Sequence, residues 1–191
     1  MPNWCCTSMV LTGDKEEIAD LYERMQRLEN MSEPLVPNGF GTRWLGNLVA
    51  DLGKDWKDVG CRGTWSFLEL LDENTLKFNT ETAWYRCTEV DDLIMKKYPS
   101  IDITFQCVEG GMVIYETNDE EGRYFPERYM IDVEDSDTQY FDLKEDALDF
   151  LEEFFGIDFK NMSEALEVTE EYDNNEANDC NRIWIHEFEI V

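Results

Sequence analysis

A small group of residues near the ends of predicted strands could form a ligand site. Trp84 lies between a predicted strand and the start of a predicted helix, and Arg86 follows closely. An indole offers an apolar surface, while guanidinium, amide and hydroxyl groups can orient a polar ligand. The sequence therefore predicts a small-molecule pocket lined by Asn3, Trp4, Thr82, Trp84 and Arg86. The alternative is that Trp84 is buried and its indole N–H donates to a backbone carbonyl.

Signatures of catalysis are absent from the sequence. No GxSxG, GxxxxGK[ST] or GxGxxG motif occurs. The single histidine, His186, falls within an alternating strand pattern, which favours a structural role. With 44 Asp and Glu residues, close carboxylate pairs arise by chance and do not identify an acid–base couple. We therefore predict a non-enzymatic protein without a cofactor.

Metal-binding patterns are also missing. The chain has six cysteines but no CxxC pair and only one histidine, so zinc-ligand spacings are absent. In residues 117–128, placing Gly122 at the sixth position of a calcium loop puts Arg128 at the twelfth, where a glutamate is needed. We expect no specific metal site and reduced, mostly buried thiols.

Negative charge dominates the composition. The chain has a net charge of −28, and residues 132–179 alone contain 18 acidic and 2 basic residues. Such a surface repels nucleic acid and anionic membranes and attracts basic proteins. We therefore expect a basic protein partner, without direct nucleic-acid or membrane binding. The acidic residues predicted to form this interaction face are Glu134, Asp135, Asp137, Glu145, Asp146, Asp149, Glu152 and Glu153.

Two other interpretations of the charge stay open. A rigid row of carboxylates could imitate DNA, which places one negative charge per about 1.7 Å of helix axis, and so inhibit a restriction or CRISPR nuclease. Alternatively, the charge only keeps the protein soluble. The pattern itself does not separate a contact surface, a DNA mimic and a solvated face.

The elements that position these residues are predicted from hydrophobic periodicity. Apolar and polar residues alternate through 101–107, which is typical of a strand with one buried face. Strands are predicted at 4–12, 64–71, 76–80, 101–107 and 112–117. One helix is predicted to be capped by Asp14 with Glu17, and a second by Thr88 with Asp91, with Val90, Leu93 and Ile94 facing inward. The order βαββαβ predicts an α+β, ferredoxin-like (split βαβ) fold with an antiparallel sheet.

Residues 31–60 interrupt this order as a predicted helical insertion. Prolines and glycines break the periodicity before Thr42, which is expected to cap a short helix. Large aromatic side chains are mostly buried in folded proteins. We therefore expect Trp44 and Trp56 to dock the insertion on the sheet.

Residues 134–191 are predicted to be an acidic C-terminal extension packed on a domain of residues 1–133. A strand is expected at 123–133, at an edge or interrupted because it contains Pro126. Helices are expected after Asp142, capped with Glu145, and from Ser163, and a strand at 182–191.

The opening MPNWC and the later TAW element resemble the YubB-like family, small proteins of phages, plasmids and integrated mobile elements. The similarity covers about residues 1–133 and also includes Phe78, Thr80, Tyr98, Pro99, Glu109 and Gly110. It implies a ferredoxin-like domain and a mobile-element origin, and it carries no activity.

No run of about 18 apolar residues and no signal core occur, so we expect a cytoplasmic protein. Three function classes follow from the sequence: an interaction protein, a DNA-mimic inhibitor, and a ligand-binding module or enzyme at the Trp84 end. The sequence does not indicate an oligomeric state.

Overall fold

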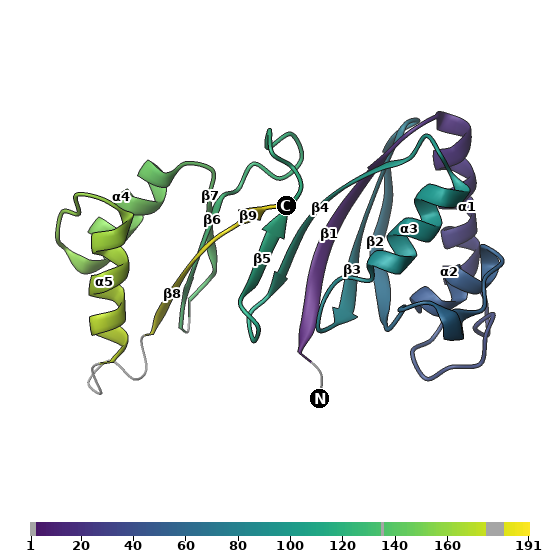
Figure 1. Ribbon diagram of the computed structural model, residues 1–191, viewed down its shortest axis with the longest axis horizontal. Helices are drawn as coiled ribbons and strands as arrows, with labels where there is room; N and C mark the ends of the chain where they lie inside the picture. Colours follow the sequence, from purple (N-terminus) through teal and green to yellow (C-terminus); the bar gives the residue numbers. More distant parts are fainter. Residues whose placement is uncertain (1–2, 135, 175–181) are drawn as a thin grey trace. The chain divides into compact units, whose positions relative to one another are not determined.

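The computed structural model describes residues 3–134, 136–174 and 182–191. Within these ranges the chain is an α+β protein with five α-helices, one short 3-10 helix and nine strands. It divides into two compact units, unit 1 from Met1 to Asn118 and unit 2 from Asp119 to Val191 (Figure 1). Each unit has its own hydrophobic core.

Unit 1 contains an antiparallel sheet whose strands lie in the order β2–β3–β1–β4–β5. β1 therefore lies between two strands that come much later in the sequence, and it is antiparallel to both. The predicted strands of this region are confirmed, each within a few residues of its expected bounds. They are β1 Trp4–Thr12, β2 Gly63–Asp72, β3 Thr75–Ala83, β4 Asp102–Glu109 and β5 Ile114–Thr117.

Three helices cover one face of this sheet (Figure 1). They are α1 Lys15–Glu29, α2 Leu45–Asp51 and α3 Thr88–Lys97, and the 3-10 helix η1, Trp56–Asp58, follows α2. The buried residues of α1 recur at helical spacing, as its periodicity predicted. They are Ile18, Leu21, Met25 and Leu28.

The covered face of the sheet is apolar at one end of the strands and polar at the other. At the apolar end Leu11 lies opposite Leu76 and Ile103, and all three are buried. At the other end Cys5 lies opposite Thr82, and both are fully buried. Because side chains alternate along a strand, residues an even number apart on β1 lie on the same face. The residues of the predicted ligand site lie at or near this polar end of the sheet.

The helical insertion docks on the core of unit 1, as predicted. Trp44 is only 5% exposed, and its ring meets the partly buried Trp56 edge to face, with centroids 5.1 Å apart. The buried Asn47 amide donates to the carbonyl oxygens of Gly41 and Thr42, both at 3.0 Å. The insertion is therefore held both by aromatic packing and by a buried amide.

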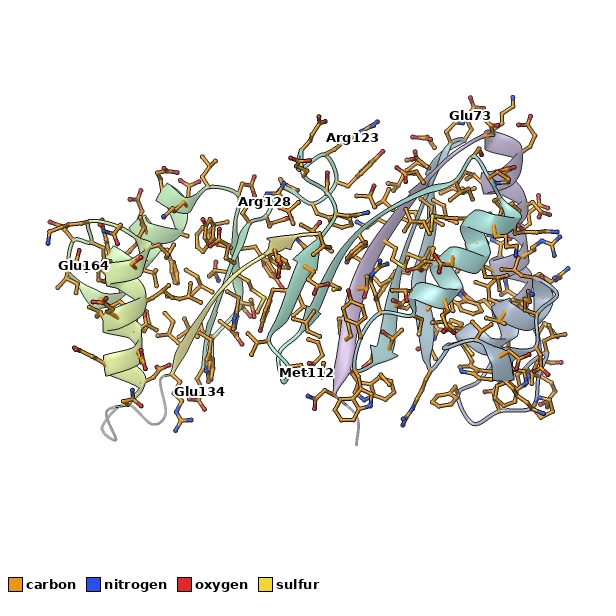
Figure 2. The ribbon with its side chains drawn as sticks, in the orientation of Figure 1. Glu73, Met112, Arg123, Arg128, Glu134 and Glu164 are labelled. Carbon is orange, nitrogen blue, oxygen red and sulfur yellow. The ribbon has the colours of Figure 1, made fainter. Side chains whose placement is uncertain are left out.

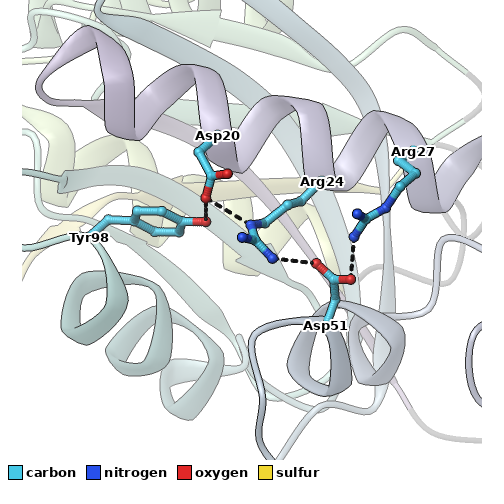
Figure 3. A network of polar contacts seen from close by, with 5 residues as sticks. All are labelled: Asp20, Arg24, Arg27, Asp51 and Tyr98. Atoms are coloured by element: carbon cyan, nitrogen blue, oxygen red, sulfur yellow. Dashed lines mark hydrogen bonds and ion pairs between the residues drawn. The ribbon is translucent and has the colours of Figure 1, made fainter.

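A polar network ties the three helices together (Figure 3). Arg24 donates from Nε to Asp20 at 2.8 Å and from Nη1 to Asp51 at 3.0 Å. Arg27 donates to the other oxygen of Asp51, and the Tyr98 hydroxyl donates to Asp20 at 2.6 Å. Asp51 ends α2 and Tyr98 follows α3, so α1 is connected to α2 through its arginines and to the end of α3 through Asp20.

Two predicted helix caps of unit 1 are wrong. Asp14 precedes α1, but its side chain makes no capping hydrogen bond. Glu17 instead accepts hydrogen bonds from the N–H and hydroxyl of Ser100, at 2.9 and 2.7 Å. The Thr42 hydroxyl donates to the Glu29 carbonyl at 3.2 Å rather than capping α2. In both cases a tertiary partner replaces the local one.

Unit 2 contains a three-stranded antiparallel sheet in the order β7–β6–β8. The strand predicted at 123–133 begins only at Tyr129, because the Asp119 carboxylate accepts hydrogen bonds from the N–H groups of residues 123–125 and holds them in a loop. The boundary expected after residue 133 lies after Asn118, since β6 pairs with β7 and β8. The strands are β6 Tyr129–Val133, β7 Gln139–Phe141, β8 Ile183–Glu187 and the short β9 Glu189–Ile190, so the predicted last strand is interrupted at Phe188.

The two helices of unit 2 pack on this sheet through small and aliphatic residues. They are α4, Lys144–Phe155, and α5, Met162–Asp173. Ala147, Leu151 and Ala165 are fully buried. The residue preceding α4 is Leu143, and no side chain caps this helix, so the predicted Asp142 and Glu145 cap is wrong. Within the described ranges, no helix has the length and apolar character needed to cross a membrane.

Candidate functional site

The segment from Trp84 to Cys87 joins β3 to α3 and crosses the polar end of the unit 1 sheet. The Ala83 N–H donates to the Arg62 carbonyl at 3.0 Å, and the Trp84 N–H donates to the Asn3 carbonyl at 2.8 Å. Trp84 has a φ of 74°, a left-handed conformation that costs a bulky residue about 1–2 kcal/mol. Hydrogen bonds on both sides therefore hold the segment in a strained turn.

The residues predicted to line one pocket do not form a common pocket wall in the structure. Trp4 and Trp84 are 39% and 47% exposed. The alternative of a buried Trp84 indole is therefore wrong, because Trp84 follows the last residue of β3 and lies beyond the covered face. The buried Thr82 hydroxyl donates to the Tyr85 carbonyl at 2.8 Å and so fixes the turn. Asn3 supports the same turn through its carbonyl.

Arg86, the fifth predicted residue, reaches from this segment over the sheet. Its guanidinium lies over the Phe105 ring of β4, with the guanidinium carbon 3.8 Å from the ring centroid. Nη1 donates to the Asp91 carboxylate at 2.5 Å. Nε is buried and has no hydrogen-bond partner within the described part of the chain. A fixed guanidinium with one unsatisfied donor is thus placed at the polar end.

Asp91 is a buried carboxyl on the first turn of α3. It is 7% exposed, and burial raises its pKa to about 7, while the nearby Arg86 charge opposes the rise. Of the three residues expected to face inward on this helix, Val90 and Ile94 are buried and Leu93 is partly buried. The prediction that Asp91 completes a helix cap with Thr88 is wrong, because Cys87 precedes α3, no side chain caps this helix, and the Asp91 carboxylate accepts from Arg86 instead.

Two neighbours of Arg86 in the sequence, Tyr85 and Cys87, have raised pKa values. The Tyr85 hydroxyl donates to Glu116 on β5 at 2.7 Å, and burial raises the Tyr85 pKa. Burial also raises the pKa of the Cys87 thiol to about 12, so it stays protonated and weakly nucleophilic near neutral pH. Cys5, Cys6, Cys61 and Cys107 are also free thiols, whereas Cys180 lies outside the described residues. Over the described ranges, no group of His, Cys, Asp or Glu is arranged to hold a metal ion.

An open hollow of about 260 Å³ lies beside this segment. It is lined by Gly60, Arg62, Ala83, Tyr85, Arg86, Cys87, Thr88 and Glu89. On the inner side, Arg86 and Asp91 also border a cavity of about 10 Å³, the space of about one water molecule. Arg86 is therefore shared by the surface hollow and the interior.

Sequence reasoning identified one residue of this hollow and missed the others. Arg86 was predicted, but Arg62 and Thr88 were not assigned to the site. Arg62 precedes β2, and the register of β2 on β3 places Gly63 opposite Thr82. That pairing brings Arg62 close to the start of α3. No pattern in the neighbouring sequence predicts this proximity.

The predicted acidic face divides between two places in unit 2. Glu145, Asp146, Asp149 and Glu153 are exposed on α4, and their side chains make no hydrogen bond or ion pair with described residues. Glu134 follows the end of β6 and Asp137 lies between β6 and β7, whereas α4 follows the other end of β7 (Figure 2). Glu152 is partly buried and accepts a hydrogen bond from the Phe159 N–H at 2.8 Å. Asp135 lies outside the described residues.

α5 adds acidic residues that were not predicted for this face. Glu167, Glu170 and Glu171 are exposed and make no side-chain hydrogen bond or ion pair to the described part of the chain. Glu164 is different, since it pairs with Lys160 at 3.6 Å and accepts a hydrogen bond from the Lys160 N–H at 2.8 Å. We call the exposed carboxylates of the two helices the α4/α5 acidic surface; they are Glu145, Asp146, Asp149, Glu153, Glu167, Glu170 and Glu171.

Comparison of the chain with models of known protein families gives no match, and comparison with curated proteins gives none. The two candidate sites are therefore interpreted from their own geometry. They are the α4/α5 acidic surface of unit 2 and the hollow beside Arg86 in unit 1.

Proposed function

We propose that the protein is a non-enzymatic interaction protein that binds a basic protein partner through the α4/α5 acidic surface. The observation that carries this proposal is that seven exposed carboxylates on two neighbouring helices have no cationic partner within the described part of the chain. Unit 2 as a whole has 24 acidic and 5 basic residues. Charge left unpaired over a surface attracts an oppositely charged partner and speeds its association.

The charge density along α4 favours a basic protein partner that does not hold DNA in a cleft. Glu145, Asp149 and Glu153 follow each other at i, i+4 and so form a row along one side of α4. Four residues of helix rise about 6 Å, so the row has one charge per about 6 Å. Duplex DNA has one negative charge per about 1.7 Å of helix axis when both strands are counted. Along its axis the row therefore has a lower charge density than the DNA that a mimic must imitate.

The proposal includes a fold family and an origin. The antiparallel order β2–β3–β1–β4, with α1 after β1 and α3 after β3, supports a ferredoxin-like assignment for unit 1. The resemblance to the YubB-like family adds a phage or mobile-element origin to this proposal. A partner encoded by the host cell fits that origin.

The test compares two variants of equal net charge. One neutralises the α4/α5 acidic surface (E145Q, D149N, E153Q, E167Q, E171Q), and the control neutralises five exposed glutamates of unit 1 (E23Q, E33Q, E69Q, E73Q, E81Q). Each protein is immobilised and incubated at low salt, where exposed charges act most strongly, with lysate of cells that carry the gene. Captured proteins are quantified by mass spectrometry.

We expect a basic protein that the unmodified chain and the control retain and that the α4/α5 variant loses. Equal capture by both variants would show that net charge alone acts, and it would refute the proposed surface. If the retained protein binds DNA and duplex DNA competes for it, the DNA-mimic interpretation replaces this one.

A further inference from the structure

The hollow beside Arg86 combines features that suit a small anion. Two arginines line it from different segments, Arg62 before β2 and Arg86 before α3. Arg62 is exposed and its side chain makes no hydrogen bond or ion pair with described residues. An arginine presents several N–H donors in a planar array that matches phosphate and carboxylate oxygens.

Arg86 is held in place before any ligand binds. Stacking on Phe105 and the hydrogen bond to Asp91 fix the guanidinium from two directions. Only 20% of its side chain is exposed, yet its Nε has no hydrogen-bond partner within the described ranges. A buried donor without a partner is unfavourable, so an acceptor that reaches Nε would be favoured.

The acidic groups near the hollow are already engaged. Glu89 accepts a hydrogen bond from the Gly60 N–H, and both residues line the hollow. Glu116 accepts from Tyr85, and Asp91 accepts from Arg86. Their carboxylates are thus directed to protein donors, whereas the Arg62 side chain is free to turn toward a ligand.

The start of α3 adds a further favourable element. Thr88 and Glu89, the first two residues of this helix, both line the hollow. The N-terminal end of a helix carries partial positive charge and favours anions. The volume of about 260 Å³ is below the usual range for drug-sized ligands, which indicates a small molecule.

We propose that this hollow binds a small phosphate-bearing molecule, with Arg62 and Arg86 contacting the phosphate oxygens and Thr88 at the start of α3 beside them. Two guanidinium groups approaching from separate segments suit an anion with several oxygens. This site is in unit 1 and does not depend on the α4/α5 acidic surface. It makes unit 1 a ligand-binding module beside the proposed interaction function.

Inorganic phosphate and phenyl phosphate are the probes for the test. They are titrated into isotope-labelled full-length protein, and amide chemical shifts are followed by NMR, with sodium chloride of equal ionic strength as the reference. We expect saturable shifts centred on residues 60–62 and 85–89. Arg62→Gln should weaken binding about tenfold, as expected for losing one charge-assisted contact. Arg43→Gln removes an exposed arginine that does not line the hollow and should leave binding unchanged.

Three outcomes would overturn the proposal. The first is a set of shifts that sodium chloride reproduces. The second is equal weakening by Arg62→Gln and Arg43→Gln. The third is acetate binding as tightly as phosphate, which would assign the hollow to carboxylates. The Arg62 side chain is exposed and makes no hydrogen bond or ion pair in the described part of the chain, so its substitution leaves a folded protein in which each outcome can be measured.

Discussion

Replacing Arg86 with methionine tests whether this side chain compensates a buried carboxyl. Asp91 is almost fully buried, and its carboxylate accepts a hydrogen bond from Arg86 at 2.5 Å. Burial raises the Asp91 pKa to about 7 even with the Arg86 charge present. Methionine keeps an apolar stem near the Phe105 ring but removes the charge. The Asp91 pKa should therefore rise further in this variant.

The direction of the pH effect follows from where the proton is held. In an unfolded chain aspartate titrates near 3.9, so between about pH 4 and pH 7 the folded protein keeps a proton on Asp91 that the unfolded chain has released. Below the pKa of Asp91 in the unfolded chain, its contribution to the free energy of unfolding is at its maximum. As pH rises, this contribution falls by at most about 1.4 kcal/mol per pH unit, until the pH exceeds the pKa of Asp91 in the folded protein.

The cost of Arg86→Met should therefore grow above neutral pH. Near about pH 6 both proteins hold the Asp91 proton, and the variant loses mainly the hydrogen bond and the contact with Phe105, about 1–3 kcal/mol. Near about pH 8.5 only the variant still keeps the proton, which adds up to about 2 kcal/mol. The total then reaches about 3–5 kcal/mol, the usual cost of breaking a buried ion pair.

Urea unfolding followed by tryptophan fluorescence, at constant ionic strength and a series of pH values, measures this difference. Subtracting the free energies of unfolding of two proteins at each pH removes the contributions of the other acidic groups. Asp91→Asn should flatten the pH dependence below pH 7, and in the double variant the added cost of Arg86→Met should no longer change with pH. A cost of Arg86→Met that is the same at both pH values would refute the reasoning.

Two further substitutions, each with a control, test the ion pairs of Asp51 and the backbone strain at Phe67 in unit 1. Asp51→Asn should lower the free energy of unfolding by about 2 kcal/mol in urea titrations, because this mostly buried carboxylate accepts from both Arg24 and Arg27. Arg27→Gln, at the exposed side, should cost less than about 1 kcal/mol, and equal losses would contradict this account. Phe67→Gly should raise the calorimetric unfolding temperature by about 4 °C, because Phe67 is 80% exposed and has a φ of 53°. Phe67→Ala keeps the Cβ atom and should give no such gain.

The helix caps show where local reasoning reaches its limit. The sequence pairs Asp14 with Glu17 at the right spacing, and α1 does begin there. Glu17 nevertheless bonds Ser100, which approaches only because β4 lies beside β1. A polar side chain can accept from any donor within hydrogen-bond distance, and tertiary packing decides which donors lie that close.

The position of Trp84 shows the same limit at the candidate site. Its type and its place after a strand predicted either a pocket wall or a buried indole. The structure exposes it and brings Arg62 and Arg86 to the same hollow. Arg62 reaches the start of α3 only through the pairing of β2 with β3. This pairing depends on the register of two strands, which the residues around Arg62 do not encode.

The sequence by itself determined the strands and helices of unit 1 and the acidic character of the chain. Side-chain alternation and helical spacing act over a few residues, and net charge is a sum that folding does not change. Only the tertiary structure decided where the chain divides, which carboxylates stay unpaired and which arginines share a hollow. These properties depend on distances between segments far apart in the sequence, and strand order and register set those distances.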